Sequence, residues 1–270
     1  NELKSTFVCD LGDCSSSRPC MGVQKMFGFQ CSVKRYHTFF VSDSFLPDTV
    51  SEKEKETRIM IITLKDGSKK EYAEAKSVID IAADISEGLA RVACAGEVDG
   101  EVVDLRHVVD KDCELSILTF EDEGGKGAFR HTTSHIMAQA IKRLYPDVKL
   151  AIGPSIADGF YYDIDSENPI TTEDLAKIEV EMKKVVKEAL PITRFTKSRE
   201  EAIAFFKEKN EPYKVELIED LPEDAEISFY QQGEFVDLCA GPHLMTTKPV
   251  KAFKLTSIAG AYWRGSEKIG

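Results

Sequence analysis

The chain has 270 residues, which is enough for one to two domains that each bury a hydrophobic core. Its formal net charge of -12 argues against a protein that coats nucleic acid non-specifically, because such binding depends on many Lys and Arg contacts to phosphates, although a local basic patch could still hold a structured RNA. It contains no run of about 18 apolar residues that would span a membrane, and its seven irregularly spaced cysteines favour a reducing, cytoplasmic setting over a disulfide framework.

Residues 1–59 are expected to be an unstructured or non-native leader that ends in a charged linker. This region holds four of the seven cysteines, shows no sustained period of two or 3.6, and ends with the charge run SEKEKETR. The cysteine spacings of five, six and eleven match no common zinc pattern, so metal binding here is the less favoured alternative. Met60 would make a natural start for the segment that follows.

Residues 60–121 predict a small β-grasp, ubiquitin-like domain. The β-rich run RIMIITL, the turn KDG and the run SKKEYAEA predict a hairpin. The stretch SVIDIAADIS predicts a helix with Ser77 as its N-cap, because its apolar residues recur at helical spacing. A second hairpin that turns at Asp99-Gly100 and a closing strand CELSILTF complete the order β-β-α-β-β, in which a sheet grips one helix.

Residues 122–265 predict a second, larger domain, so that the whole chain belongs to the α+β class. The stretch EDEGGKG is expected to link the two domains. Apolar spacing, capping residues and terminating prolines predict helices over AFRHTTSHIMAQAIKRLY, TTEDLAKIEVEMKKVVKEAL and SREEAIAFFKEKN. Strands are predicted over LAIGPSIADGFYYDID, ITRFT, YKVELIEDL, EISFYQQGEFVDLC and KAFKLTSIAGAYWRG.

Two pairs of residues with metal-binding side chains stand out in this second segment. His131 and His135 share one face of a predicted helix, and Cys239 and His243 flank a Gly-Pro turn. A set of His, His, Cys and His suits zinc, and with all four ligands bound the site would be structural. A zinc-protease site is disfavoured because no Glu follows His131. A metal-free pocket, in which the histidines polarise a water or hold a substrate, and unrelated histidines are the other interpretations.

Six motifs follow one another between Met60 and Gly265. They are MIITLKDGSKKEY, RHTTSHIMAQAIKRLYPDVKLAIGP, GFYYDID, PYKVELI, VDLCAGPH and LTSIAGAYWRG. With these motifs the chain resembles the N-terminal part of threonyl-tRNA synthetases (threonine–tRNA ligases) of the bacterial and eukaryotic type. The resemblance implies a ubiquitin-like TGS domain followed by an editing domain, which hydrolyses the ester of serine wrongly attached to tRNA(Thr). The full-length protein would use ATP to join threonine to tRNA(Thr).

The resemblance also implies which residues form the editing site, and each family position carries the expected residue type. Hydrolysis in the threonyl family is generally thought not to need a metal, whereas the same two pairs hold zinc in alanyl-tRNA editing proteins. We therefore expect editing without a cofactor, with zinc at His131, His135, Cys239 and His243 as the alternative. The implied catalytic residues are His131, Lys214 and Asp237, and the implied substrate-binding residues are His135, Tyr162, Cys239 and His243.

The expected partners follow from the same resemblance. They are tRNA(Thr) and the serine or threonine esterified to it, and no membrane. In the family the last motif leads into an aminoacylation domain that binds ATP, magnesium and a separate zinc, so residues 266–270 are expected to begin the linker to that missing domain. We expect the full-length protein to dimerise through that domain and this piece to be a monomer. A free-standing trans-editing deacylase and a non-catalytic tRNA-binding module with structural zinc are the alternatives.

Overall fold

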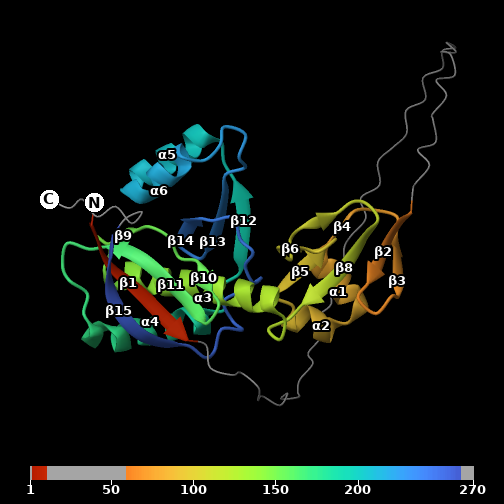
Figure 1. Ribbon diagram of the computed structural model, residues 1–270, viewed down its shortest axis with the longest axis horizontal. Helices are drawn as coiled ribbons and strands as arrows, with labels where there is room; N and C mark the ends of the chain where they lie inside the picture. Colours follow the sequence, from red (N-terminus) through yellow and green to blue (C-terminus); the bar gives the residue numbers. More distant parts are fainter. Residues whose placement is uncertain (1, 11–58, 263–270) are drawn as a thin grey trace, which may run out of the picture. The chain divides into compact units, whose positions relative to one another are not determined.

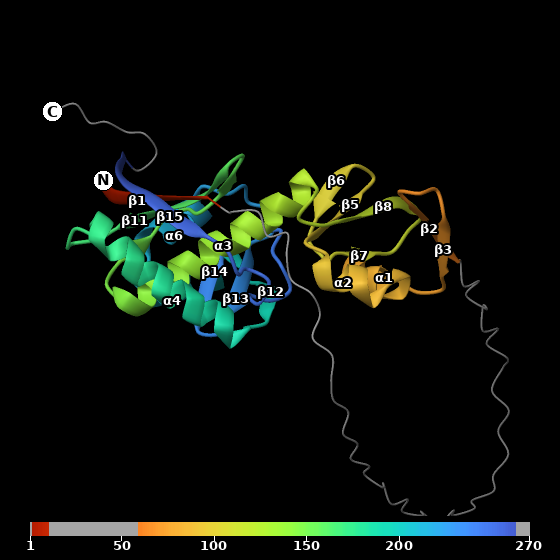
Figure 2. The same ribbon diagram turned by 90° about the horizontal axis from the view of Figure 1, so that it is seen from below.

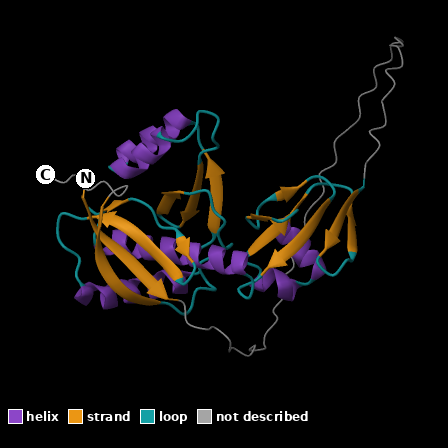
Figure 3. Cartoon of the chain, viewed as in Figure 1, coloured by secondary structure: helices purple, strands orange, loops and turns teal. Residues whose placement is uncertain are grey.

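The computed structural model describes residues 2–10 and 59–262 (Figure 1). Helices and strands are both abundant in this part of the chain, and they form the α+β fold that the sequence predicted (Figure 3). None of the helices in the described ranges is both long and apolar enough to cross a bilayer. The described residues form one compact unit, within which a smaller and a larger set of elements each surround their own apolar core.

The smaller set is the predicted β-grasp domain. The first and last strands of its sheet, β2 and β8, pair in parallel at the centre, and the neighbouring pairs are antiparallel. Helices α1 (Val78–Ile85) and α2 (Glu87–Val92) lie on one face of this sheet (Figure 2). The sheet order is β3 (Lys69–Tyr72), β2 (Met60–Leu64), β8 (Cys113–Leu118), β5 (Ala95–Val98) and β6 (Glu101–Val103), and β4 (Lys76–Ser77) pairs separately with β7 (Val108–Val109).

Local signals explain the two features of this domain that the sequence predicted. The hydroxyl of Ser77 accepts a hydrogen bond from the Asp80 amide, which caps the first turn of α1. Asp99 and Gly100 both have positive φ, at 50° and 86°, as a two-residue turn between β5 and β6 requires. The hairpin and the helix therefore arise from neighbouring residues, whereas the parallel pairing of β2 with β8 depends on the packing of the whole domain.

A long helix, α3 (Glu123–Leu144), runs through the larger domain. Helix α4 (Leu175–Glu188) packs against α3 and against β15, and a short 3₁₀ turn, η1 (Thr172–Asp174), precedes it with Thr171 and Asp174 in a capping box. The apolar core lies between these helices and an antiparallel sheet (Figure 2). The order in that sheet is β10 (Ser155–Ile156), β11 (Gly159–Asp165), β1 (Glu2–Asp10) and β15 (Lys254–Tyr262), with β9 (Lys149–Leu150) paired to β11.

A second antiparallel sheet completes the larger domain. Helices α5 (Arg199–Glu208) and α6 (Pro212–Glu219) pack against it around a separate apolar cluster that includes Phe206 and Phe229. Ser198 and Glu201 form a capping box at the start of α5, as the sequence predicted. The strands of this sheet follow the order β12 (Ile192–Thr196), β13 (Ser228–Gln232) and β14 (Phe235–Leu238).

The structure differs from the sequence prediction at the N-terminus. Residues 1–59 were expected to be unstructured, but Glu2–Asp10 form β1, which pairs with β11 on one side and β15 on the other. Main-chain hydrogen bonds to both neighbouring strands hold β1, so its sequence needs no strict alternation of apolar and polar residues. Both partner strands lie more than a hundred residues away in the sequence, so no local pattern indicates the pairing. Of the four cysteines in this region, only Cys9 lies within the described residues. The predicted charged linker SEKEKETR lies outside them.

The expected linker at 121–127 is wrong, because α3 already begins at Glu123. The glycines in this stretch serve close packing instead of a flexible connection. A Cβ atom at Gly125 would lie 1.8 Å from the backbone oxygen of Thr119, at the end of β8. The helix therefore starts directly against the last strand of the β-grasp domain, at a distance that only glycine permits.

The predicted strand over YKVELIEDL is also wrong, because these residues belong to α6. The run alternates weakly, and such a short apolar run fits a buried helix as well as a strand. Pro212 at the first helical position was the signal that could have decided between them, since its fixed φ favours a helix start. The correction matters for the site because Lys214 lies on this helix.

Candidate functional site

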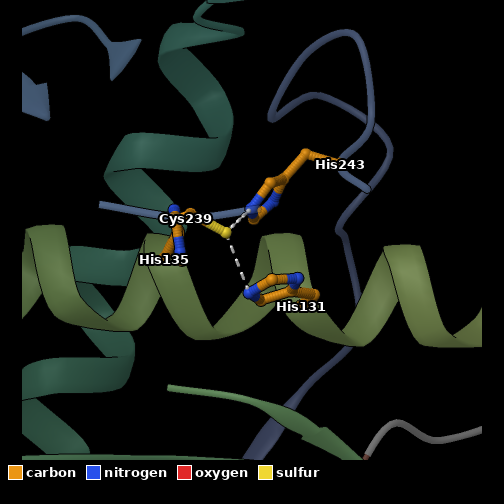
Figure 4. A group of neighbouring side chains, drawn as sticks. All are labelled: His131, His135, Cys239 and His243. Carbon is orange, nitrogen blue, oxygen red and sulfur yellow. Dashed lines mark hydrogen bonds between the residues drawn. The ribbon is translucent and has the colours of Figure 1, made fainter. Parts of the chain in front are cut away.

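Four side chains from two distant parts of the chain meet in the larger domain. His131 and His135 lie one turn apart on α3, and Cys239 and His243 lie in the loop after β14 (Figure 4). The sulfur of Cys239 is 3.3 Å from Nε2 of His131 and 3.1 Å from Nε2 of His243. One ligand atom from each of the four side chains lies within 4.8 Å of the others. The two sequence pairs therefore form one cluster.

Thr132, also on α3, sets the orientation of the His243 ring. Its hydroxyl donates to the Ala128 carbonyl (2.9 Å) and accepts from the Leu244 amide (3.0 Å). Because its single proton is already used, the 3.2 Å contact with Nδ1 of His243 is a hydrogen bond that the imidazole donates. The ring proton of neutral His243 therefore sits on Nδ1, which leaves the Nε2 lone pair directed at the sulfur of Cys239.

A buried ion pair stands beside this cluster. Nζ of Lys214, on α6, lies 2.6 Å from Oδ1 of Asp237, on β14, and each side chain is almost fully shielded from solvent. Lys214 also donates to the hydroxyl of Tyr162 (3.0 Å), and Tyr162 in turn donates to Oδ2 of Asp237. Nε2 of His135 is 3.5 Å from the same carboxylate oxygen. Asp237 thus joins the lysine, the tyrosine and the histidine cluster.

The pair is charged despite its burial. Burial alone would raise the pKa of Asp237, but the Lys214 charge, His135 and the hydrogen bonds from Lys214 and Tyr162 outweigh it and hold that pKa below its usual range. Burial, followed by the negative charge of Asp237, raises the pKa of the Tyr162 phenol well above its ordinary value. The site therefore holds an ionised Asp237 carboxylate and a protonated Tyr162 phenol, whose hydroxyl donates a hydrogen bond to that carboxylate.

The three histidines of the cluster are neutral near pH 7. Burial lowers the pKa of His131 to about 4 and that of His135 to about 3, although the Asp237 charge opposes the shift in both. Burial also lowers the pKa of His243 well below its ordinary value. It raises the pKa of the Cys239 thiol to about 12. Without a bound cation the cluster thus consists of neutral imidazoles around a protonated thiol.

Two residues at the start of α6 bring Lys214 to this place. Glu211, at the start of the helix, accepts from Lys142 (2.8 Å) at the end of α3 and from the Leu150 amide (2.8 Å). The hydroxyl of Tyr213 donates to Asp165 on β11 (2.9 Å). Because α6 also packs against the three-stranded sheet, these bonds connect the helix that carries Lys214 to α3, β9 and β11.

A cavity of about 450 Å³ opens over the cluster, a size typical of small-ligand sites. Residues 152–155 and residues 237–241 both contribute to its lining. Its lining residues include His131, His135, Gly153, Lys214, Asp237 and Cys239.

Comparison with known proteins agrees with this architecture. Residues 60–119 match the TGS domain family, and residues 227–269 match the family described as threonyl and alanyl tRNA synthetase second additional domain. The chain is 66% identical over 207 residues to a threonine–tRNA ligase of Acetivibrio thermocellus, covering 77% of this chain and 33% of that protein. A threonine–tRNA ligase of Clostridioides difficile is 62% identical over 206 residues, covering 76% and 32%.

The chain belongs to the threonyl-tRNA synthetase family. It spans about one third of the length of the curated relatives it matches. The two family models cover the β-grasp domain and the C-terminal part of the larger domain from residue 227, so the TGS fold predicted from the sequence is confirmed.

The structure brings together all seven side chains that the family resemblance singled out. Their individual roles stay predictions, because convergence in one pocket does not assign chemistry. Sequence reasoning missed the surrounding residues Thr132, Asp104, Arg106 and Tyr230, which contact the loop that carries His243. Asp104, Arg106 and Tyr230 lie outside the six motifs, and Thr132 lies inside one without a role of its own in the pattern, so only their position in the fold reveals them.

The donor set of this family member fits a zinc ion. Two imidazoles present Nε2 to the Cys239 sulfur, a third lies beside them, and the Thr132 contact fixes His243 in the tautomer that zinc-binding histidines use. With zinc bound, His131, His135, Cys239 and His243 would fill a tetrahedral shell, and the metal would supply structural stability with no open position for a substrate.

The buried histidines predict that the metal-free chain loses stability as the pH falls. Their folded pKa values are lowered, so the unfolded chain binds more protons below its histidine pKa of about 6.5, and unfolding becomes easier. Between pH 7.5 and 5, we expect His135 and His243 each to remove about 2 kcal/mol from the free energy of unfolding. Urea unfolding in EDTA, followed by circular dichroism, measures this.

His135→Gln should reduce that pH-dependent loss by about 2 kcal/mol, because one neutral buried base is gone. His107→Gln is the matched control, since His107 is exposed on the β-grasp domain. An equal loss in the wild type and in His135→Gln would show that His135 does not contribute.

Proposed function

We propose that this chain hydrolyses the ester that links serine to tRNA(Thr). The observation that carries the proposal is that two neutral imidazoles, a thiol and the buried Lys214–Asp237 pair line one cavity of about 450 Å³. The family match to the second additional domain of threonyl and alanyl tRNA synthetases supports it. An open cavity with bases and a fixed cation fits ester hydrolysis better than it fits a passive tRNA-binding module.

Editing has a physical reason in a threonine enzyme. Serine lacks only the methyl group of threonine, and a missing methyl group is worth roughly 1–3 kcal/mol of discrimination in a pocket. A second site that admits serine and excludes threonine therefore improves accuracy. In this chain we assign the exclusion of the methyl group to the wall formed by His135, Cys239 and His243, which are held in place by mutual contacts.

The proposed reaction is attack of water on the ester carbonyl carbon. The bond between that carbon and the ribose oxygen breaks, serine leaves as the free acid, and the ribose oxygen takes up a proton. His131 is neutral near pH 7 and partly open to the cavity, so it can accept the proton of the attacking water. Its protonated ring can then return a proton to the leaving ribose oxygen.

Lys214 supplies positive charge where the reaction develops negative charge. Its ammonium group has three N–H donors, of which Asp237 and Tyr162 take two, and it lines the cavity. The third donor is available to the carbonyl oxygen as that oxygen becomes negative. Asp237 holds the lysine, and Tyr162 fixes the carboxylate from the other side.

The test is deacylation of seryl-tRNA(Thr) by the purified chain, with threonyl-tRNA(Thr) as the comparison. We expect hydrolysis of the seryl ester well above its spontaneous rate and little hydrolysis of the threonyl ester. His131→Gln should lower kcat by about 10²–10⁴-fold, as loss of a general base does. His107→Gln, which replaces an exposed histidine, serves as the control. A wild-type rate equal to the spontaneous rate contradicts the proposal.

The same assay decides between metal-free and zinc-containing sites. The four convergent donor atoms are the observation that favours the zinc alternative. We propose that hydrolysis needs no metal. Activity should therefore survive treatment with EDTA, with metal analysis used to measure the zinc content of the chain. One zinc per chain, with loss of activity on its removal, would make the zinc alternative correct and the metal-free mechanism wrong.

For a protein of the relatives' full length we propose the activity for which the relatives are named, the joining of threonine to tRNA(Thr), with ATP as the energy source. Under this proposal ATP, magnesium and a separate zinc bind outside the described residues, the protein acts in the cytoplasm, and dimerisation does not involve this region.

A further inference from the structure

A carboxylate of the β-grasp domain holds the main chain of the editing loop. Oδ2 of Asp104, in the segment between β6 and β7, accepts from the His243 amide (3.0 Å) and from the hydroxyl of Tyr230 (2.9 Å). Only 11% of the Asp104 side chain is exposed, so water competes little for these bonds. The residue therefore contacts the very position that carries one of the four cluster side chains.

Arg106 binds the same loop from the same segment. Its guanidinium donates to the carbonyls of His243 (3.3 Å), Leu244 (3.0 Å) and Ile192, the first residue of β12. It also donates to Oδ1 of Asp104 (2.9 Å), which fixes the two side chains relative to each other. Both main-chain polar groups of His243 are thus bonded to the β-grasp domain.

Among the described residues, only Asp104 and Arg106 bond the main chain of His243. The loop itself is held at its start by Ser228, which bonds the Cys239 main chain, and by the Gly241 amide, which donates to the Cys239 sulfur (3.2 Å). It follows β14, contains the cis peptide bond Gly241-Pro242, and leaves the strand ladder after the bond between Cys239 N and Ser228 O. Thr132 fixes the His243 ring and the Leu244 amide, but it does not contact the His243 main chain. The 3.1 Å contact between Cys239 and His243 then depends on where Asp104 and Arg106 place the backbone.

We propose that Asp104 and Arg106 are positioning residues for the editing site, through which the β-grasp domain controls the shape of the pocket. They do not line the cavity; they hold the His243 end of the loop of residues 239–244, and with it the contact of His243 with Cys239. This inference rests on the proposed editing function for its activity readout. Under this inference the β-grasp domain contributes to hydrolysis by positioning the loop that carries His243.

The test combines two variants and two readouts. Asp104→Ala removes the acceptor of the His243 amide, and Arg106→Lys keeps the charge but loses the planar fork that spans the carbonyls. For seryl-tRNA(Thr) deacylation we expect kcat to fall about 10–100-fold with KM changed less than twofold, as suits a group that orients the site without binding substrate. Asp110→Ala, an exposed carboxylate of the same domain, is the matched control and should keep the wild-type kcat.

The second readout does not depend on activity. The rate of alkylation of Cys239 by iodoacetamide, resolved by peptide mass spectrometry, should rise at least fivefold in both variants, because the loop no longer holds the thiol against His131 and His243. Cys113 in the core of the β-grasp domain should keep its slow rate, which shows that this domain stays folded.

Unchanged Cys239 alkylation and unchanged kcat in both variants would overturn the inference. Faster alkylation of Cys113 as well as Cys239 would also count against it, since that result indicates general unfolding. If the wild-type chain does not deacylate seryl-tRNA(Thr), the proposed function fails, and the alkylation rates still decide whether Asp104 and Arg106 hold the loop.

Discussion

Replacing Lys214 with Met is expected to abolish ester hydrolysis and to lower the free energy of unfolding by about 3–5 kcal/mol. The side chain of Asp237 is 2% exposed, so in Lys214→Met its charge stays buried without a cation beside it. Methionine has nearly the length of lysine, which keeps the loss of packing small. Urea unfolding measures the stability, and deacylation of seryl-tRNA(Thr) measures the activity.

The double variant Lys214→Met, Asp237→Asn separates the effect of an unpaired buried charge on stability from the effect of losing Lys214 on hydrolysis. Removing both charges should restore most of the lost stability, because a neutral amide costs far less to bury than an unpaired carboxylate. Activity should stay lost, since neither the cation nor the carboxylate is present. A single variant as stable as the wild type would show that Tyr162 and His135 alone compensate Asp237.

Lys214 also shows where prediction from sequence reaches its limit. Taken alone, the run YKVELIEDL predicted a strand. In the fold the residue lies on α6, and its partners Tyr162 and Asp237 come from β11 and β14. The family motif identified the residue, but its burial and its partners depend on contacts between segments far apart in the chain.

The histidine and cysteine pairs were more accessible to sequence analysis. A spacing of four places two side chains on one face of a helix or at the ends of one turn, and this geometry is local. Two such pairs suggested a shared site, and the structure brings them together. The same local logic found Ser77 and Ser198 as caps, since a cap involves only residues within one turn.

Sequence analysis could not predict the contacts of Asp104 and Arg106 or the pairing of β1. The contacts of Asp104 with His243 and Tyr230 span more than 120 residues of sequence, and β1 pairs with β11 and β15, both more than a hundred residues away. Nothing in the segment VDLRHVV distinguishes these charges from ordinary surface residues. Such long-range partners become visible only once the two cores are in place.

A single methyl group added at Gly153 is expected to damage the site nearly as much as the loss of Lys214. The Cβ atom of Gly153→Ala would lie 2.1 Å from Cδ2 and 2.4 Å from Cε2 of the Tyr162 ring. The loop cannot easily retreat, because its Gly153 carbonyl accepts from Ser134 on α3 (2.6 Å). Tyr162 must therefore move, and its hydroxyl leaves Asp237 and Lys214.

We expect Gly153→Ala to lower the free energy of unfolding by about 3 kcal/mol, the upper end of the usual cost of overpacking, and kcat for seryl-tRNA(Thr) by at least about 100-fold, as misplacement of the reacting groups by 1 Å does. Gly127→Ala is the matched control. Its Cβ would meet only Ser155 Oγ, at 3.9 Å, and it lies within α3, where alanine should stabilise the chain by about 0.5–1 kcal/mol. If Gly153→Ala keeps wild-type activity, Tyr162 does not need its present contact with Asp237 for hydrolysis, and the lysine and carboxylate suffice.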